Sequence, residues 1–469
     1  MKLPFKRGDL LNDVRVEDLT TEGHGIARVD RAVLFIEGAA PGDIVDILVY
    51  RTKKNYGEAK VITIKSSSPD RTTPRCQHFG VCGGCKLQHI TYDRQLAFKQ
   101  KLVTDAFERI GKVEFPELLP IVGSELIFEY RNRLDYAAAD RRWLTSEEIA
   151  SGVPITSPAL GFHVPGRFDK ILDIERCHLQ ENTSNSIRNF IKDHAIKRGL
   201  EFFNPVSQEG LLRNVIVRST STNEWMVIVV FKKEDKAARI ELLEQLRDHF
   251  PQITSLLYII NEKRNDTIFD QEVICFSGRD HILEKMEGLT FKISAKSFYQ
   301  TNSAQAYRLY TITRDFAELT GNENVYDLYT GTGTIAQFVA KSARHVAGID
   351  YVEDAIADAV KNAEFNGIGN VSFVAGDLKD AFNDEFISKN GKPDVIITDP
   401  PRAGMHPDVV EKLLELKPDR IVYVSCNPTT QARDVQMLST AYRIVKIQPV
   451  DMFPHTTHVE NVVLLKRFD

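Results

Sequence analysis

The sequence predicts a multidomain fold: a small β-barrel first, then a mixed α+β domain, then a doubly wound α/β domain that ends the chain. Three observations support this prediction. At 469 residues the chain is too long for a single hydrophobic core. Short strand-like segments fill residues 8–66, and from residue 291 onward strand-like runs alternate with helical ones, which is typical of a mostly parallel sheet.

The predicted barrel occupies residues 1–66. Its strand-like runs are GDLLNDVRVEDLT, IARVDRAVLFIEG, DIVDILVYRTKK and GEAKVITIKSS, and the turn signals EGHG, AAPGD and KNYG separate them. Several short strands at regular spacing indicate a barrel of the oligonucleotide-binding kind. A polar, proline-containing linker, SSSPDRTTP, follows it.

A group of cysteines lies directly after this linker. Cys76, Cys82 and Cys85 fall within RCQHFGVCGGCKLQH, and Cys177 in ERCHL completes a set of four. Clustered cysteines in a cytosolic protein are more often metal ligands than disulfides. The spacing fits either a [4Fe–4S] cluster or tetrahedral zinc.

We expect residues 67–91 and 126–290 to form the central α+β domain around these cysteines. Within it, NVIVRST and WMVIVVF read as strands and AARIELLEQLRDHF as a helix. Residues 92–125 should form a helical segment, with a helix from Tyr92 to about Ile110, that packs on the C-terminal domain.

Charge is distributed unevenly along the chain. The net charge of −5 argues against a nucleic-acid partner, yet residues 51–112 hold 13 Lys and Arg against 5 Asp and Glu. This surplus indicates either a basic nucleic-acid face or an ordinary solvated surface. No apolar run is long enough to span a bilayer and no signal core follows the N-terminus, so we expect a cytoplasmic protein without a membrane partner.

The C-terminal domain of residues 291–469 has polar residues where its predicted strands end. DLYTGTGT, Asp327 to Thr334, leads from a strand through a glycine-rich turn into a helix, and the next strand ends at Asp350. Later strands end at Asp377 and at Asp399, the latter followed by two prolines. Ligands of such sheets bind at the carboxyl ends of the strands, where Asp350 can meet a ribose and Asp377 an adenine amino group. These strand ends, in this order, resemble a Rossmann-like S-adenosylmethionine-binding domain more than a nicotinamide-binding one.

Two further residues are candidates for catalysis. Cys426 ends the fifth strand, RIVYVSC, at the edge that also carries Asp399, although a free cysteine is more often an inert core residue. Glu460 lies in FPHTTHVENVVLLKRF, directly before the last strand, where it is either a base with a raised pKa or a simple loop anchor.

DLYTGTGT, TDPPR, SCNP and FPHTTHVE together resemble the RNA uracil-5-methyltransferase family, and SAKSFYQTN (294–302) resembles the segment before that family's catalytic core. The resemblance implies that Cys426 is the nucleophile, that Glu460 is the proton-abstracting base and that Phe298 stacks on the target base. It also implies contacts with the methyl donor S-adenosylmethionine for Gln300, Tyr329, Thr334, Asp350, Asp377 and Asp399. Members of the family often have Asn at position 334, Glu at position 350 and Asn or Asp at position 377, so both Thr334 and Asp350 depart from the pattern, Thr334 the more.

The chemistry of this family explains the need for both catalytic residues. C5 of uracil is a weak nucleophile, and a thiolate that adds to C6 turns C5 into a carbanion able to attack a methyl sulfonium. A base must then remove the C5 proton so that the thiolate can leave.

The resemblance extends to the N-terminal half. The family's ribosomal-RNA branch carries a [4Fe–4S] cluster with this cysteine pattern and a TRAM barrel like residues 8–66, whereas its tRNA branch typically lacks both. It therefore implies a 23S rRNA substrate with the target base flipped out, and a structural cluster beside basic side chains that contact RNA. Those side chains are Lys53, Lys54, Arg71, Arg75 and Lys86. Nothing in the sequence indicates an obligate protein partner.

Three alternatives remain open. A tRNA uracil-5-methyltransferase would use the same chemistry on another RNA. An RNA cytosine-5-methyltransferase would carry a second cysteine after its proline, and TDPPR has none. A non-catalytic iron–sulfur RNA-binding protein would not need Asp399, Cys426 and Glu460 together.

Overall fold

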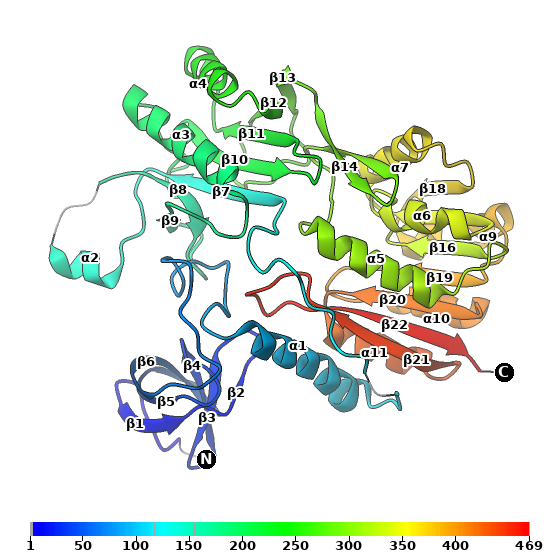
Figure 1. Ribbon diagram of the computed structural model, residues 1–469, viewed down its shortest axis with the longest axis horizontal. Coiled ribbons are helices and arrows are strands. Elements are labelled where there is room, and N and C mark those ends of the chain that lie inside the picture. The colour runs from blue at the N-terminus through cyan, green and yellow to red at the C-terminus, as the bar shows by residue number, and fades with distance from the viewer. Residues whose placement is uncertain (1–2, 117, 153–155, 469) are drawn as a thin grey trace.

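The structure is a computed structural model that describes residues 3–116, 118–152 and 156–468. Its strands form three large sheets (Figure 1). The N-terminal sheet lies at the lower left of the figure, the central sheet above it and the C-terminal sheet to the right. Among the described helices none is long and apolar enough to cross a membrane.

The N-terminal barrel is a six-stranded sheet in the order β1-β5-β6-β4-β3-β2. Its long strand β6 pairs antiparallel with β5 and parallel with β4, which closes the sheet around a core that includes Leu34, Ile36 and Ile47. Alternate residues of β5 are buried, as expected for a strand with one face on a core. The strands are β1 (Leu10–Arg15), β2 (Asp18–Leu19), β3 (Gly25–Val29), β4 (Ala32–Glu37), β5 (Ile44–Thr52) and β6 (Tyr56–Ser66).

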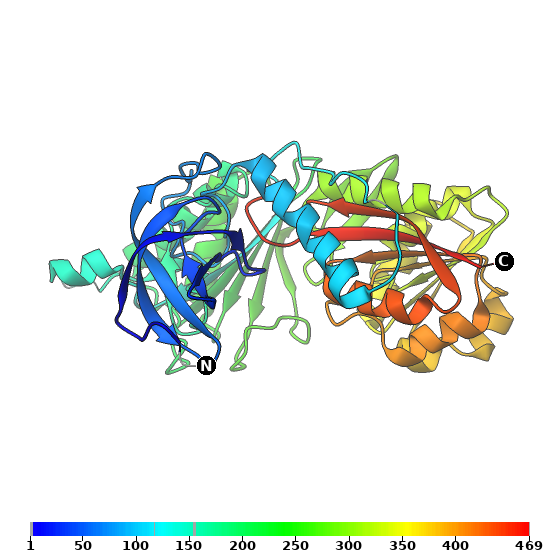
Figure 2. The same ribbon diagram turned by 90° about the horizontal axis from the view of Figure 1, so that it is seen from below.

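The segment that follows carries Cys76, Cys82 and Cys85 outside helices and strands and then becomes a helix. The helix predicted from Tyr92 is confirmed as α1 (Tyr92–Ala106), which continues as one turn of π-helix (Phe107–Gly111). Val103 and Phe107 share a buried cluster with Val435 and Ile447 of the C-terminal domain. Helix α1 thus packs on the C-terminal domain, beside the strands drawn in red (Figure 2).

The central domain is a seven-stranded sheet in the order β13-β12-β11-β10-β7-β8-β9. The predicted strands around Val215 and Val229 are present, as is the helix predicted around Leu243. A two-stranded hairpin, β14–β15, then leads to the C-terminal domain, and its Phe291 lies in a core cluster shared by both domains. The elements are β7 (Arg133–Ala139), α2 (Ser146–Ser151), β8 (Ala159–His163), β9 (Ile171–Asp173), α3 (Asn182–Arg198), β10 (Leu212–Ser219), β11 (Trp225–Phe231), α4 (Lys236–His249), β12 (Ile253–Ile260), β13 (Ile274–Gly278), β14 (His281–Met286) and β15 (Leu289–Ser294).

The C-terminal domain is a seven-stranded sheet in the order β18-β17-β16-β19-β20-β22-β21. The first five strands are parallel, and β22 is inserted antiparallel between β20 and β21. The dinucleotide-binding order 3-2-1-4-5-6 has no such insertion. The elements are α5 (Ser303–Ala317), β16 (Asn324–Leu328), α6 (Thr334–Val339), a 3-10 turn (Ala340–Ser342), β17 (His345–Asp350), α7 (Glu353–Phe365), β18 (Val371–Ala375), α8 (Leu378–Ala381), α9 (Asp384–Asn390), β19 (Val395–Thr398), α10 (Pro407–Leu416), β20 (Arg420–Ser425), α11 (Pro428–Leu438), β21 (Tyr442–Val450) and β22 (Glu460–Arg467).

Candidate active site

The glycine-rich turn after β16 has the geometry of a ligand-binding turn. Gly331 and Gly333 adopt φ of 55° and 70°, and a Cβ at Gly333 would lie 2.8 Å from the Phe373 ring. Buried Asp327 accepts hydrogen bonds from Thr330 Oγ1 at 2.5 Å and from the Ala336 amide at 3.1 Å. Only glycine fits this turn, because a side chain at 333 would meet both strain and a close neighbour.

Asp350 stands at the end of β17 as the sequence predicts. Its carboxylate accepts the amides of Gly331 at 2.9 Å and Val352 at 2.9 Å. Each carboxylate oxygen has two lone pairs, so both can still accept a ribose hydroxyl. Thr334 is the first residue of α6, and its hydroxyl lies 3.2 Å from that of Thr332.

Tyr329 and Asp377 line one cavity of about 510 Å³ beyond the ends of β16 and β18. Tyr329 has a φ of 63°, and burial raises its pKa to about 12. Asp377 is exposed and caps α8 through the Lys379 amide at 3.1 Å. This cavity, with Met405, Pro407 and Val409 among its apolar lining, is large enough for a flat aromatic base.

Asp399, Cys426 and Glu460 meet at one edge of the sheet. Asp399 and Cys426 directly follow β19 and β20, and Glu460 begins β22, which runs antiparallel so that Asn461 pairs with Ser425. Burial and the Asp399 charge raise the pKa of Glu460 to about 8, and burial with the Asp327 charge raises that of Asp399 to about 7. The sequence analysis placed Cys426 and Asp399 at one edge, and the antiparallel course of β22 brings Glu460 to them; the roles of the three residues stay a prediction.

Burial and the same carboxylates keep Cys426 protonated. They raise the pKa of its thiol to about 11, against which a hydrogen bond and the charge of Arg402 act. The Arg402 guanidinium also lies 3.5 Å from both ring nitrogens of His458. The sequence analysis assigned no role to Arg402 and so missed its place beside the nucleophile.

The segment before α5 positions Gln300 and Phe298 near the glycine-rich turn. The Phe298 carbonyl accepts the Thr332 hydroxyl at 3.4 Å, while the Phe298 side chain is 67% exposed. The Gln300 carbonyl accepts Asn132 Nδ2 at 2.9 Å. An exposed aromatic ring on a segment held this way is available to stack on a base.

Cys76, Cys82, Cys85 and Cys177 all line one cavity of about 540 Å³ in the central domain. Burial raises the pKa of the Cys85 thiol to about 12 and that of Cys177 to about 11. Across the described residues, no group of three or more His, Cys, Asp or Glu side chains is arranged around one point that could hold a single metal ion. Cys275 is exposed, because it lies on the edge strand β13.

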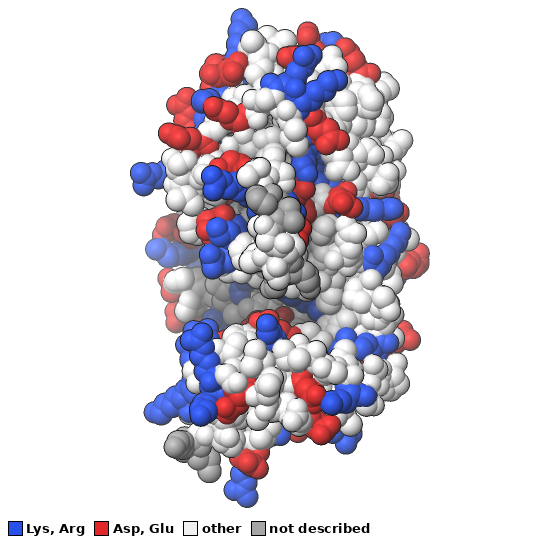
Figure 3. Space-filling view, turned by 90° about the vertical axis from the view of Figure 1, so that its left-hand side faces the viewer, with Lys and Arg blue, Asp and Glu red and all other residues white. Residues whose placement is uncertain are grey.

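The basic stretch of residues 51–112 is less available for RNA than its composition implies. Arg71 is tied to buried Asp43 at 2.5 Å, and Arg75 pairs with Glu129 at 3.8 Å while it stacks on the Phe128 ring. Lys53 and Lys54 are exposed on the barrel. Figure 3 shows a hollow between the barrel and the central domain with both basic and acidic side chains on its rims.

The strand order and the strand-end site together define an S-adenosylmethionine-dependent methyltransferase domain. The family model described as tRNA (Uracil-5-)-methyltransferase matches residues 204–468, and the TRAM domain model matches residues 12–62. The chain belongs to the RNA uracil-5-methyltransferase family, and it uses S-adenosylmethionine to methylate RNA.

Relatives extend over the full chain. A protein of Bacteroides thetaiotaomicron named as an uncharacterized RNA methyltransferase is 55% identical and covers 96% of this chain and 100% of the relative. A similar protein of Porphyromonas gingivalis is 54% identical over 97% of this chain and 99% of the relative. The crystal structure of Pyrococcus abyssi tRNA (uracil-54, C5)-methyltransferase with S-adenosyl-L-homocysteine is 32% identical, with a TM-score of 0.73, over 97% of this chain and 100% of that one.

Proposed function

We propose that the enzyme methylates C5 of a specific uridine in 23S rRNA through a covalent bond to Cys426. The Cys426 thiolate adds to C6, and the electron pair moves to C5, which attacks the methyl group that the donor supplies as an electrophile. Glu460 then takes the C5 proton, the C5–C6 double bond re-forms, and the thiolate leaves. The meeting of Cys426, Glu460 and Asp399 at one sheet edge is the observation that supports this mechanism most.

The electrostatics of the site suit a cationic donor. Asp327 and Asp399 both have a pKa raised to about 7. Burial is the main cause for each, and the charge of Asp350 adds to it at Asp327 and that of Asp327 at Asp399. One oxygen of Asp327 is buried without a hydrogen-bond partner among the described residues. A ligand with positive sulfonium and ammonium groups would favour the ionised carboxylates. We propose Gln300, Tyr329, Thr334, Asp350, Asp377 and Asp399 as the residues that hold it.

A second candidate substrate is tRNA. The Pyrococcus abyssi protein, whose name assigns it to uracil-54 of tRNA, matches this chain across nearly its whole length. A protein whose name assigns it to tRNA thus matches the barrel and the central domain as well, so domain content alone does not decide between the two RNAs. We keep 23S rRNA as the first candidate because the spacing of Cys76, Cys82 and Cys85, with Cys177, resembles the family's ribosomal branch.

Mass spectrometry of nucleosides from ribosomal and transfer RNA, in cells with and without the gene, separates the two substrates. Loss of 5-methyluridine from 23S rRNA alone supports the proposal. Loss from tRNA alone retains the mechanism and replaces the substrate. Unchanged 5-methyluridine in both RNAs refutes the uridine-specific function.

We propose further that Cys76, Cys82, Cys85 and Cys177 hold a [4Fe–4S] cluster with a structural role. Zinc needs four sulfurs about 2.3 Å from one point, and the described residues offer no such arrangement, whereas a cluster spreads its ligands over a larger volume and all four cysteines line one cavity. Protein purified without oxygen should contain iron and acid-labile sulfide in equal amounts. Zinc in place of iron would refute the cluster.

A further inference from the structure

The nine residues that join β21 to β22, residues 451–459, form a loop that reaches out of the C-terminal domain. Figure 2 shows it in red, projecting under α1 toward the barrel and the central domain. We name it the clasp loop. Glu460 directly follows it as the first residue of β22, and its His458 lies 3.5 Å from Arg402, the residue that hydrogen-bonds Cys426.

Five consecutive carbonyls of the clasp loop accept hydrogen bonds from other parts of the chain. Helix α5 and its N-cap supply two of these donors, since Gln305 Nε2 bonds the Asp451 carbonyl at 2.8 Å and Asn302 Nδ2 bonds the Met452 carbonyl at 2.9 Å. The Tyr130 hydroxyl bonds the Pro454 carbonyl at 2.9 Å. These hydrogen bonds satisfy carbonyls that would otherwise be buried without a partner.

Lys99 of α1 supplies the third carbonyl bond and a buried charge. Its Nζ donates to the Phe453 carbonyl at 3.0 Å and to Asp451 Oδ1 at 2.6 Å, and neither charged side chain is exposed to solvent. The other oxygen of Asp451 accepts the Tyr92 hydroxyl at 2.8 Å, and Asp451 Oδ1 also accepts the Phe453 amide at 3.1 Å.

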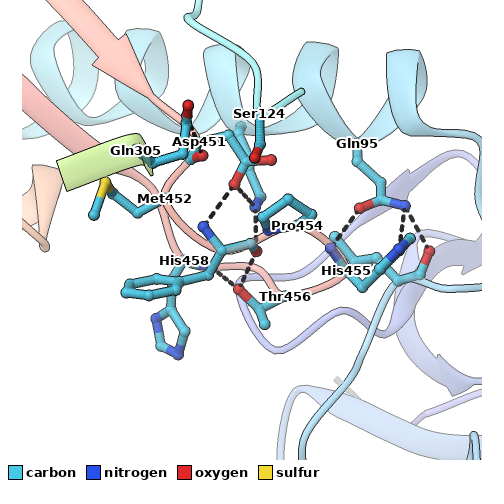
Figure 4. A network of polar contacts seen from close by, with 12 residues as sticks. Gln95, Ser124, Gln305, Asp451, Met452, Pro454, His455, Thr456 and His458 are labelled. Atoms are coloured by element: carbon cyan, nitrogen blue, oxygen red, sulfur yellow. Dashed lines mark hydrogen bonds and ion pairs between the residues drawn. The ribbon is translucent and has the colours of Figure 1, made fainter. Parts of the chain in front are cut away.

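Gln95, one turn earlier on α1, holds the tip of the clasp loop (Figure 4). Its Oε1 accepts the His455 amide at 2.8 Å, and its Nε2 lies 3.2 Å from His455 Nδ1. The amides of Lys86 and Leu87, next to Cys85, donate to the His455 carbonyl at 2.8 and 3.0 Å.

A buried ion pair is a weak source of net stability, because the desolvation of both charges offsets their attraction. Its directional hydrogen bonds do fix one conformation of the segment that they hold. The clasp loop is held on both sides of its tip, and it leads within a few residues to the base. A displacement of the base by about 1 Å is enough to slow proton transfer by about 10²-fold.

We propose that Gln95 and Lys99 are positioning residues for the general base, acting through the clasp loop. The inference rests on the proposed function, in which Glu460 removes the C5 proton. It assigns helix α1, outside the catalytic sheet, a part in the second half of the reaction. Weakening the contacts of the clasp loop should slow adduct collapse, in which the C5 proton is removed and Cys426 leaves the methylated base, more than it slows methyl transfer.

The test uses single-turnover reactions of the full chain with S-adenosylmethionine and RNA from cells that lack the gene. Two quantities are measured: methyl groups transferred, and enzyme–RNA adduct that survives denaturing electrophoresis. Glu460→Gln should accumulate methylated adduct. Lys99→Met/Asp451→Leu and Gln95→Met should do the same, with collapse slowed ~10²-fold.

A control keeps the comparison specific. Lys466→Met/Glu318→Gln removes a 2.6 Å ion pair from the far end of β22 and should behave as wild type. If Lys99→Met/Asp451→Leu does not fold, Gln95→Met decides. Wild-type adduct collapse in folded clasp variants, or an equal loss of methyl transfer and collapse, overturns the inference. Absence of adduct in Glu460→Gln instead overturns the assignment of the base, and with it the proposed mechanism.

Discussion

Collapse of the methylated Cys426 adduct should follow the ionisation of Glu460. In the adduct Cys426 is a thioether without charge, while burial and Asp399, the causes that raise the pKa of Glu460 to about 8, remain. A base acts only when deprotonated, so the rate of adduct collapse should fall as the pH falls through 8. A carboxylate with this pKa is deprotonated in about 1% of molecules at pH 6, about 10% at pH 7 and about 50% at pH 8, which predicts an increase of about 50-fold from pH 6 to pH 8.

The assay is rapid quenching of a preformed adduct at fixed temperature and salt, between pH 6 and pH 9. Release of tritium from RNA labelled at uracil C5 reports the same step independently. An ordinary glutamate, with a pKa near 4.5, would give a flat profile over this range. A flat profile, or a rise that persists in Glu460→Gln, would refute the assignment of a base with a raised pKa.

Three further predictions follow from the same geometry. Cys426→Ser should lower methylation by about 10⁴-fold or more and abolish the covalent complex with 5-fluorouridine RNA. Its non-covalent RNA binding should be unchanged in gel-shift assays, and a covalent complex that forms without Cys426 would contradict the mechanism. Gly333→Ala should cost about 1–3 kcal/mol, because φ is 70° and the new Cβ would meet Phe373 and Ala359 within 2.9 Å; Gly321→Ala, at a φ of 97° with nothing within 4 Å, should cost less on thermal melting. Protein without the methyl donor should melt at a lower temperature at pH 8.5 than at pH 6, since a carboxyl with a raised folded-state pKa loses its stabilising contribution as the pH rises through that pKa. If the change in melting temperature between pH 6 and pH 8.5 is the same in Glu460→Gln as in the wild type, Glu460 is not its cause.

The strand ends of the catalytic domain were predictable because the parallel strands β16, β17, β19 and β20 are buried on both faces. Such strands read as continuous apolar runs, and the polar residue that ends each run marks the ligand edge. Asp350, Asp399 and Cys426 stand where this reasoning places them. Strand β21 was missed because its buried and exposed positions mix at the sheet edge and Pro449 interrupts the pattern.

Contacts between distant segments were not predictable from local pattern. Lys99 lies in a stretch whose basic surplus suggested an RNA face, yet its side chain is buried against Asp451, more than 350 residues away in sequence. Arg71 shows the same limit, since its charge is neutralised by Asp43 of the barrel. Composition counts charges, whereas their availability depends on a partner that only the fold supplies.

The carboxylates of the active site also determine when the thiolate of Cys426 forms. Burial, together with the charges of Glu460 and Asp399, raises the pKa of Cys426, so before ligands bind the cysteine is a thiol and is protected from oxidation, which requires the thiolate. A positively charged methyl donor beside Asp399 offsets the carboxylate that disfavours the thiolate, and Arg402 already acts in the same direction. Binding of the donor should therefore lower the pKa of Cys426. Alkylation of Cys426 by iodoacetamide should be faster with bound S-adenosylmethionine than with S-adenosylhomocysteine, whose sulfur is a neutral thioether, although both cover the same surface. Equal rates would show that the sulfonium charge of the donor does not activate the nucleophile.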